Sequence, residues 1–99
     1  MRVAGEFVWH SHPGMDELFV VLDGELTIDL REPSGTGTGE RAVVLRAGDV
    51  YTVPADVPHR PRSAGGARLL LVEPAGMVNT GDFTGAVPEH IDRTEGRPL

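Results

Sequence analysis

Short apolar stretches separated by Gly, Pro and Asp run through most of the chain, and no segment has the roughly 3.6-residue period of an amphipathic helix. Stretches of this kind, rich in Val, Leu and Phe, are typical of β-strands bounded by turns. We predict seven strands, Val3–His12, Glu17–Leu22, Glu25–Arg31, Arg41–Arg46, Val50–Val53, Pro58–Arg62 and Arg68–Glu73. So many short strands in a small chain favour an all-β sandwich or closed barrel.

Turn-forming residues separate these strands and mark a change near the C-terminus. Asp23-Gly24 is a strong signal for a two-residue hairpin between the second and third strands. Pro33–Gly39, rich in Gly, Ser and Thr, is predicted to be a flexible loop. The strand pattern weakens after residue 74, so we predict a barrel over residues 1–74. Residues 75–99 are then a tail that packs on the barrel or on a partner, with a disordered end.

Length and composition limit the possible functions. A chain of 99 residues forms one small domain, so a partner subunit would add stability. The net charge of −6 disfavours nucleic acid, because phosphate binding needs a basic face. The absence of cysteine excludes disulfides, zinc–thiolate sites and a thiol nucleophile. No apolar run could span a membrane and no signal peptide is visible, which indicates a cytoplasmic protein.

Successive side chains of a β-strand point to opposite faces, so the sequence predicts which side chains share a face. His10 and His12 are two residues apart, so they project to the same face of a strand. Phe7 and Trp9 then share the opposite face, and Glu17–Leu22 is apolar on both faces. Because apolar faces of this size are rarely left in water, we expect a second copy of the chain to cover them. The sequence therefore predicts a homodimer.

Three of the four histidines lie in two segments that can together supply a metal shell. His10 and His12 belong to the first segment and His59 to the second. Two imidazoles at positions i and i+2 of a strand can reach one ion, which is the physical reason for the spacing. The fourth histidine, His90, is isolated in the tail, and we expect it to be an ordinary hydrogen-bonded residue.

The two segments resemble the two conserved motifs of the cupin superfamily. They read His10-x-His12-x4-Glu17-x6-Gly24 and Gly48-x5-Pro54-x-Asp56-x2-His59. The resemblance covers roughly residues 5–74, and it implies a small double-stranded β-helix, a jelly-roll barrel. The phrases Asp16–Phe19 and Glu73–Gly76 further resemble small single-domain cupins, a group largely without assigned function.

The resemblance also implies a ligand set. By it, one divalent metal ion is bound by His10, His12, Glu17 and His59. Asp16 competes with Glu17 as the carboxylate, but the spacing to Gly24 and the strand parity favour Glu17. Two positions depart from the usual pattern. Asp56 replaces a turn glycine, although Asp tolerates the left-handed conformation, and Ser63 stands where asparagine is usual.

Three imidazoles and one carboxylate form a mixed nitrogen and oxygen donor set. This set disfavours copper(I), magnesium and calcium, and it leaves iron, manganese, nickel, cobalt and zinc open. A first-row ion bound in this way keeps about two open positions in an octahedral arrangement. Water, dioxygen or a chelating substrate can occupy those positions.

Two functions from different classes fit this site. The first is a metal-dependent oxygenase or isomerase acting on a small polar or anionic molecule. The second is a non-catalytic module that binds or senses a small molecule through its metal. No second carboxylate–histidine pair is visible, and Glu6 is the only other candidate for the inward face. We expect Glu6 to lie at the barrel mouth, facing solvent.

Overall fold

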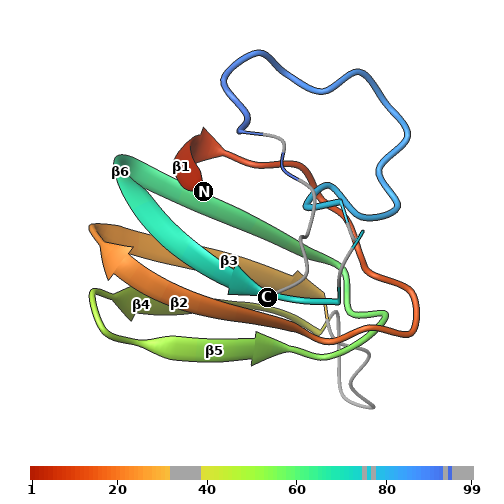
Figure 1. The fold of residues 1–99 in the computed structure, drawn as a ribbon, viewed down its shortest axis with the longest axis horizontal. Helices are drawn as coiled ribbons and strands as arrows, with labels where there is room; N and C mark the ends of the chain where they lie inside the picture. The colour runs from red at the N-terminus through yellow and green to blue at the C-terminus, as the bar shows by residue number, and fades with distance from the viewer. Residues whose placement is uncertain (32–38, 75, 77, 93, 95–99) are drawn as a thin grey trace.

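Six antiparallel strands form one strongly curled sheet in this computed structural model, which describes residues 1–31, 39–74, 76, 78–92 and 94 (Figure 1). The strands are β1 (Arg2–Glu6), β2 (Glu17–Asp23), β3 (Glu25–Arg31), β4 (Glu40–Arg46), β5 (Val50–Val53) and β6 (His59–Val72). Their order is β4-β3-β6-β2-β5, and β1 pairs with β6. The predicted all-β jelly-roll fold is confirmed.

Strand β6 corrects the sequence prediction, which divided it into two strands. It continues for 14 residues through Gly65 and Gly66, and Gly66 has a φ of 87°. Its first part pairs with β3 and its last part with β2, while β1 pairs along the middle. The sequence prediction left these two glycines between the strands Pro58–Arg62 and Arg68–Glu73, whereas in the structure one strand passes through them without a break. A single strand therefore connects the two halves of the curled sheet.

Strand β1 is shorter than predicted, because it ends at Glu6 and not at His12. Beyond it the chain leaves the regular alternation, and Phe7 and Val8 are both buried although they are adjacent. The prediction that Phe7 lies opposite the histidines on a face that a partner covers is therefore wrong, because the single chain already buries Phe7 beside the His10 ring. Pairing resumes at one point, where His10 forms an isolated antiparallel bridge with His59.

The apolar core fills the inside of the curl. Its buried members are Val3, Phe19, Val21, Leu26, Ile28, Leu30, Leu45, Val53, Ala67 and Leu69. The predicted hairpin at Asp23-Gly24 is present, and Gly24 has a φ of 84° that favours glycine. A Cβ at Gly24 would also collide with the backbone of Gly66, so the close approach of this turn to the middle of β6 requires glycine at position 24.

The predicted loop over Pro33–Gly39 lies almost entirely outside the described residues, as does the end of the tail that we expected to be disordered. The described part of the tail lies beside β1 and the segment that follows it (Figure 1). The division at residue 74 stays a prediction. In the described parts of the chain there is no helix long and apolar enough to cross a membrane.

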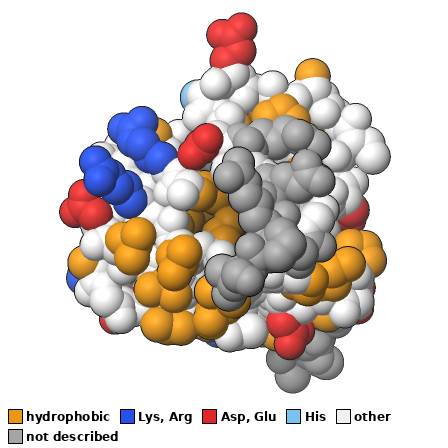
Figure 2. Space-filling model, in the orientation of Figure 1, with side chains coloured by type: hydrophobic (Ala, Val, Ile, Leu, Met, Phe, Trp, Pro, Cys, Tyr) orange, Lys and Arg blue, Asp and Glu red, His pale blue; other side chains and the backbone are white. Residues whose placement is uncertain are grey.

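The outward face of β2, β5 and β6 is apolar. Its exposed members are Leu22, Val50, Leu70 and Val72, with 57%, 56%, 51% and 40% exposure. The half-buried Val20 is paired with Val50 on one side and with Leu70 on the other, so these side chains share one face. Figure 2 shows hydrophobic side chains gathered at the lower left of the molecule in the orientation of Figure 1.

Trp9 is covered by the chain's own arginines. Arg31 lies 3.8 Å and Arg60 5.3 Å from the centroid of the half-buried Trp9 ring. Such cation–π contacts favour this position for the indole without any partner subunit. Arg60 also contacts Asp29, whose Oδ2 accepts hydrogen bonds from Arg60 Nη2 and Arg62 Nε, both at 2.9 Å. Charged groups thus hold β3 and β6 together on this side of the sheet.

The pKa of Asp29 gives these contacts a pH dependence. Burial disfavours the carboxylate, but the hydrogen bonds from Arg62 and Arg60 outweigh burial and lower the pKa. A lowered folded-state pKa contributes stability above the unfolded-state value of about 3.9, and the contribution is lost as pH falls through the folded-state pKa. The ionised Asp29 side chain therefore stabilises the folded protein at neutral pH and stops doing so in acid.

We predict that Asp29→Asn lowers the free energy of unfolding by about 1 kcal/mol near pH 7, a modest value because water screens the partly exposed arginines. The difference from wild type should shrink below about pH 4. Urea unfolding at several pH values, with Asp23→Asn at the exposed end of β2 as the matched control, measures it. An equal loss of unfolding free energy at pH 7 and below pH 4 would contradict the claim that the charge of Asp29 is the cause.

Candidate metal centre

Four buried side chains from separate parts of the sequence meet at one end of the sheet. His10, His12, Glu17 and His59 each supply a donor atom, and these atoms all lie within 4.8 Å of one another. Their exposed fractions are 4%, 4%, 1% and 1%. The ring centroids of His10 and His59 are 4.2 Å apart, and those of His10 and His12 are 5.0 Å apart. The structure therefore brings together all four residues that the sequence singled out.

Backbone pairing positions each of these side chains. His10 N donates to His59 O at 3.1 Å, and His59 N donates to His10 O at 2.8 Å. His59 begins β6, and Glu17 begins β2, where it pairs with Val53. His12 O accepts hydrogen bonds from Met15 N and Asp56 N, both at 3.2 Å. Strand ends and turns thus fix the positions from which the four side chains converge.

Two of the imidazoles are held in one tautomer. His10 Nδ1 lies 2.8 Å from Val8 O, and His59 Nδ1 lies 2.9 Å from Val57 O. A carbonyl oxygen can only accept, so Nδ1 of each ring carries the proton and donates. In a neutral ring the lone pair is then on Nε2. This is the arrangement by which a backbone carbonyl orients a metal-binding histidine.

The inner atoms of the cluster lack hydrogen-bond partners. His10 Nε2, His12 Nε2 and Glu17 Oε2 are buried without one, although His12 Nε2 is only 3.2 Å from Glu17 Oε2. Buried polar atoms are almost always paired, because desolvation without a partner is costly. In the tautomer set by Val57, the His59 lone pair faces Glu17 Oε1 at 3.2 Å. A cation among these atoms would satisfy all of them.

The spacing also suits a first-row ion. Bonds of about 2.1 Å to imidazole nitrogen or carboxylate oxygen place neighbouring ligand atoms about 3 Å apart and opposite ones about 4.2 Å apart. The observed limit of 4.8 Å needs only small side-chain shifts to meet this geometry. The residues therefore fit a single divalent ion.

The protonation of the cluster favours metal binding near neutral pH. Burial, together with the nearby His59, lowers the pKa of His10 to about 4, so this ring is neutral and its Nε2 is free to bind. Burial opposes the charge of Glu17, but contacts with His12, His59 and Glu73 lower its pKa well below the usual range. The cluster thus contains a carboxylate beside a neutral imidazole, the forms in which both bind metals.

Glu73 is a fifth polar residue at this site, and the sequence analysis missed it. Its carboxyl contacts Glu17, and burial followed by this contact raises the pKa of Glu73 to about 8. Its Oε2 is buried and has no hydrogen-bond partner. The signal was available in the alternation of β6, because Leu69 and Leu71 pack inward and the same parity extends to residue 73.

The other residues considered from the sequence lie around the cluster. Asp16 is exposed and its Oδ1 accepts from Ala55 N at 2.8 Å, so the structure places Glu17 and not Asp16 in the cluster. Asp56 has a φ of 67°, which confirms that it adopts the left-handed turn, and its Oδ1 accepts from Gly14 N at 3.0 Å. Ser63 Oγ donates to the backbone oxygen of Glu25 at 2.6 Å.

Glu6 and His90 stay outside the cluster. The Glu6 side chain is 62% exposed and pairs with Arg60 Nη1 at 2.9 Å, so the solvent-facing position expected for it is confirmed. His90 Nε2 donates to Glu6 O at 2.7 Å, as an ordinary hydrogen-bonded histidine does. Tyr51 packs against the core, and its hydroxyl accepts from Arg41 Nη2 at 3.0 Å.

A comparison with protein families identifies the family to which this fold belongs. The family described as "Cupin domain" matches residues 1–73. The chain belongs to the cupin family. The structure is similar to that of a cupin-2 domain protein from Shewanella frigidimarina, with a TM-score of 0.62 and 34% identity. That similarity covers 72% of this chain and 62% of the other.

Two curated relatives extend the comparison. This cupin is 44% identical over 59 residues to the uncharacterised protein YdbB of Bacillus subtilis, covering 60% of this chain and 46% of YdbB. It is 35% identical over 57 residues to a 3-hydroxyanthranilate 3,4-dioxygenase of Xanthomonas campestris, covering 58% of this chain and 30% of that enzyme. The chain thus spans less than half the length of both relatives.

Proposed function

We propose that this cupin binds one divalent first-row metal ion through His10, His12, Glu17 and His59 and acts as a metal-dependent oxygenase on a small polar or anionic molecule. One observation carries the proposal: three buried inner atoms of the cluster have no hydrogen-bond partner. An unpaired buried donor set is costly to keep unless something binds to it. The matching family and the spacing of the donor atoms support the same conclusion.

The chain's own residues prepare the site for this chemistry. Val8 O and Val57 O each accept a hydrogen bond from Nδ1 of one ring, which leaves Nε2 of that ring available to a metal, and His59 Nε2 lies 3.2 Å from Glu17 Oε1. Phe19 stands edge-on to the His59 ring, with centroids 6.0 Å apart, and closes one side of the cluster with an apolar group. Burial in such surroundings excludes water and strengthens electrostatic interactions inside the site.

The net charge of the metal-loaded site indicates the class of substrate. A divalent ion bound to one carboxylate and three neutral imidazoles leaves about one net positive charge at the centre. That charge favours an anionic or vicinal-oxygen ligand over a cation. When bound, the metal supplies Lewis acidity and, if it is redox-active, a means of activating dioxygen. The similarity to a protein named 3-hydroxyanthranilate 3,4-dioxygenase supports an oxygenase over an isomerase.

We predict that the wild-type chain binds one equivalent of iron(II) or another first-row ion and that His12→Ala binds it more than about 100-fold more weakly. Loss of an outer partner of a ligand already costs about 10–100-fold, and loss of the ligand itself costs more. Competition with a chromophoric chelator measures the affinity. His90→Ala is the matched control, because it removes a histidine outside the cluster.

The same samples test the reaction. The iron(II)-loaded protein should consume dioxygen with at least one member of a panel of small hydroxy acids and catechol-type diols, whereas His12→Ala should not. Equal metal affinity in wild type and His12→Ala would refute the site. Tight metal binding without dioxygen uptake on any substrate would refute the oxygenase and favour the binding or sensor module.

We also propose that the chain forms a homodimer through the outward apolar face of β2, β5 and β6. The side chains of Leu22, Val50, Leu70 and Val72 lie together there and are 40–57% exposed. An apolar face of neighbouring strands is a self-complementary surface for a twofold partner. The β2 part of this face belongs to Glu17–Leu22, which the sequence predicted to be covered on both faces, whereas Phe7 and Trp9 from the same prediction are not part of it.

Light scattering after size exclusion should give twice the chain mass for wild type at micromolar concentration. Leu70→Glu should give a monomer, because it places a charge in the middle of this face. Val44→Glu is the control, since Val44 is a similarly exposed valine on β4, a strand that pairs with β3 and not with β2, β5 or β6. A monomeric wild type, or a dimer that persists in Leu70→Glu, would contradict this interface.

A further inference from the structure

The segment that carries His10 and His12 is paired on one side only by the sheet. His10 uses its N and O for the bridge to His59 in β6. Backbone groups of successive residues in extended chain point to opposite sides, so those of Ser11 point away from β6. No described strand runs along that outer side. Without another partner, the segment between the two histidines would be held along one edge alone.

Asp82 in the tail supplies that partner. Its Oδ1 accepts from Ser11 N at 2.6 Å, its Oδ2 accepts from Ser11 Oγ at 2.9 Å, and its own N donates to Ser11 O at 3.0 Å. One residue therefore binds the amide, the carbonyl and the hydroxyl of Ser11, much as a neighbouring strand would. Charge-assisted bonds of this kind are shorter and stronger than neutral ones.

A tight turn delivers Asp82 to this position. Gly81 N donates to Val78 O at 2.9 Å, and Phe83 N donates to Thr80 O at 3.0 Å. Gly81 has a φ of 53°, and a Cβ there would lie 3.0 Å from Cδ2 of His10 and would collide with Ser11 O. The turn thus lies close to the Cδ2 edge of the His10 ring as well as to the backbone beside it.

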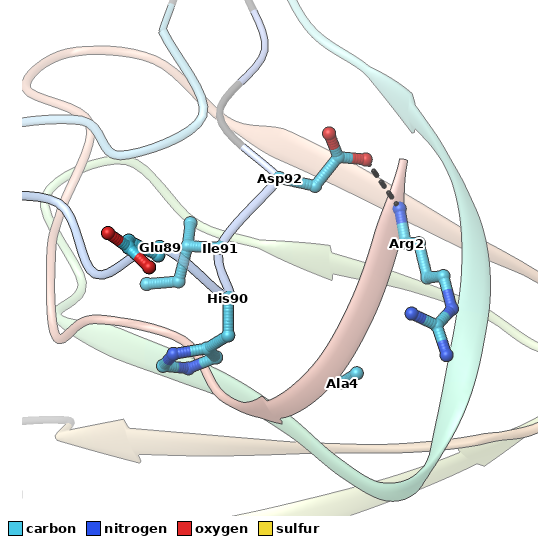
Figure 3. A pocket seen from close by; sticks show the side chains of 6 residues that line it. All are labelled: Arg2, Ala4, Glu89, His90, Ile91 and Asp92. Carbon is cyan, nitrogen blue, oxygen red and sulfur yellow. Dashed lines mark hydrogen bonds between the residues drawn. The ribbon is translucent and has the colours of Figure 1, made fainter.

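Other contacts hold the rest of the tail in place without involving His10 or His12. Arg2 N donates to Asp92 Oδ2 at 3.0 Å, next to a pocket of about 290 Å³ between β1 and residues 89–92 (Figure 3). Asn79 is 2% exposed, and its side chain donates to Asp92 O at 2.6 Å and accepts from Thr94 N at 2.9 Å. These contacts fix the turn without touching residues 10–12.

We propose that Asp82 is a positioning residue of the metal centre: by clamping Ser11 from outside, it sets the separation and direction of the His10 and His12 rings. This inference rests on the proposed metal-binding function. A metal ion accepts only a narrow range of ligand distances, so a looser backbone between two ligands weakens binding and alters the ligand geometry. The tail is then part of the site and not only a cover for β1.

Cobalt(II) binding to the full chain tests the proposal, because its visible spectrum reports ligand geometry. Asp82→Ala should bind cobalt about 10-fold more weakly, as is typical when an outer contact of a metal site is lost, and its d–d bands should shift. Asp82→Asn keeps an acceptor for Ser11 N and should restore most of the affinity and the wild-type spectrum. Asp92→Ala, which loosens the tail away from the histidines, should lower urea stability and leave the spectrum unchanged.

The outcomes separate the two proposals. Failure of wild type to bind cobalt would overturn the proposed metal function and this inference with it. Normal binding by wild type, with the same affinity and spectrum in Asp82→Ala, would overturn the inference alone. An equal spectral change in Asp92→Ala would also overturn it, because the effect would then follow general loosening of the tail. If Asp82→Ala does not fold, Ser11→Ala decides: a smaller shift in the same direction supports the clamp, and an unchanged spectrum overturns it.

Discussion

The antiparallel bridge between His10 and His59 is the contact on which the rest of the site depends. Two backbone hydrogen bonds join a segment that has left the sheet to the first residue of its longest strand. The bridge places the two rings 4.2 Å apart, and it leaves His12 two residues further along on the same side. Glu17 then enters from the start of β2. Together with the pairing of Glu17 with Val53 and the hydrogen bond from Asp56 N to His12 O, this bridge joins the two sequence motifs.

Burial of the four polar side chains of the cluster lowers the stability of the metal-free fold. The four side chains are at most 4% exposed, and three of their inner atoms lack hydrogen-bond partners. An apolar cluster of the same size would stabilise the metal-free fold more, because burial of unpaired polar atoms costs about 1–3 kcal/mol for each group. The compensation comes from the apolar core beside the cluster and from contacts outside it, such as those of Asp29 and Asp82.

Sequence reasoning predicted the all-β class from local patterns, and it took the jelly-roll fold and the four-residue ligand set from the resemblance of two short motifs to those of cupins. The hairpin at Asp23-Gly24, the parity of Glu17 with Phe19 and the spacing of the histidines each depend on neighbouring residues. Sequence reasoning failed where contacts between distant segments determine the position of a residue. Phe7 is buried because β1 ends early, β6 continues through two glycines because β1 pairs beside them, and Glu73 reaches Glu17 only in the folded chain. The contact of Asp82 with Ser11 spans 71 residues, and no local pattern predicts it.

The central claim is that His10, His12, Glu17 and His59 together bind one metal ion. Anomalous X-ray diffraction from crystals grown with a first-row metal, measured on both sides of its absorption edge, tests this most directly. The account predicts one strong anomalous peak within about 2.0–2.2 Å of His10, His12 and His59 Nε2 and of one Glu17 oxygen. A fully loaded crystal whose only peak lies elsewhere, or whose peak lacks two or more of these ligands, would contradict it.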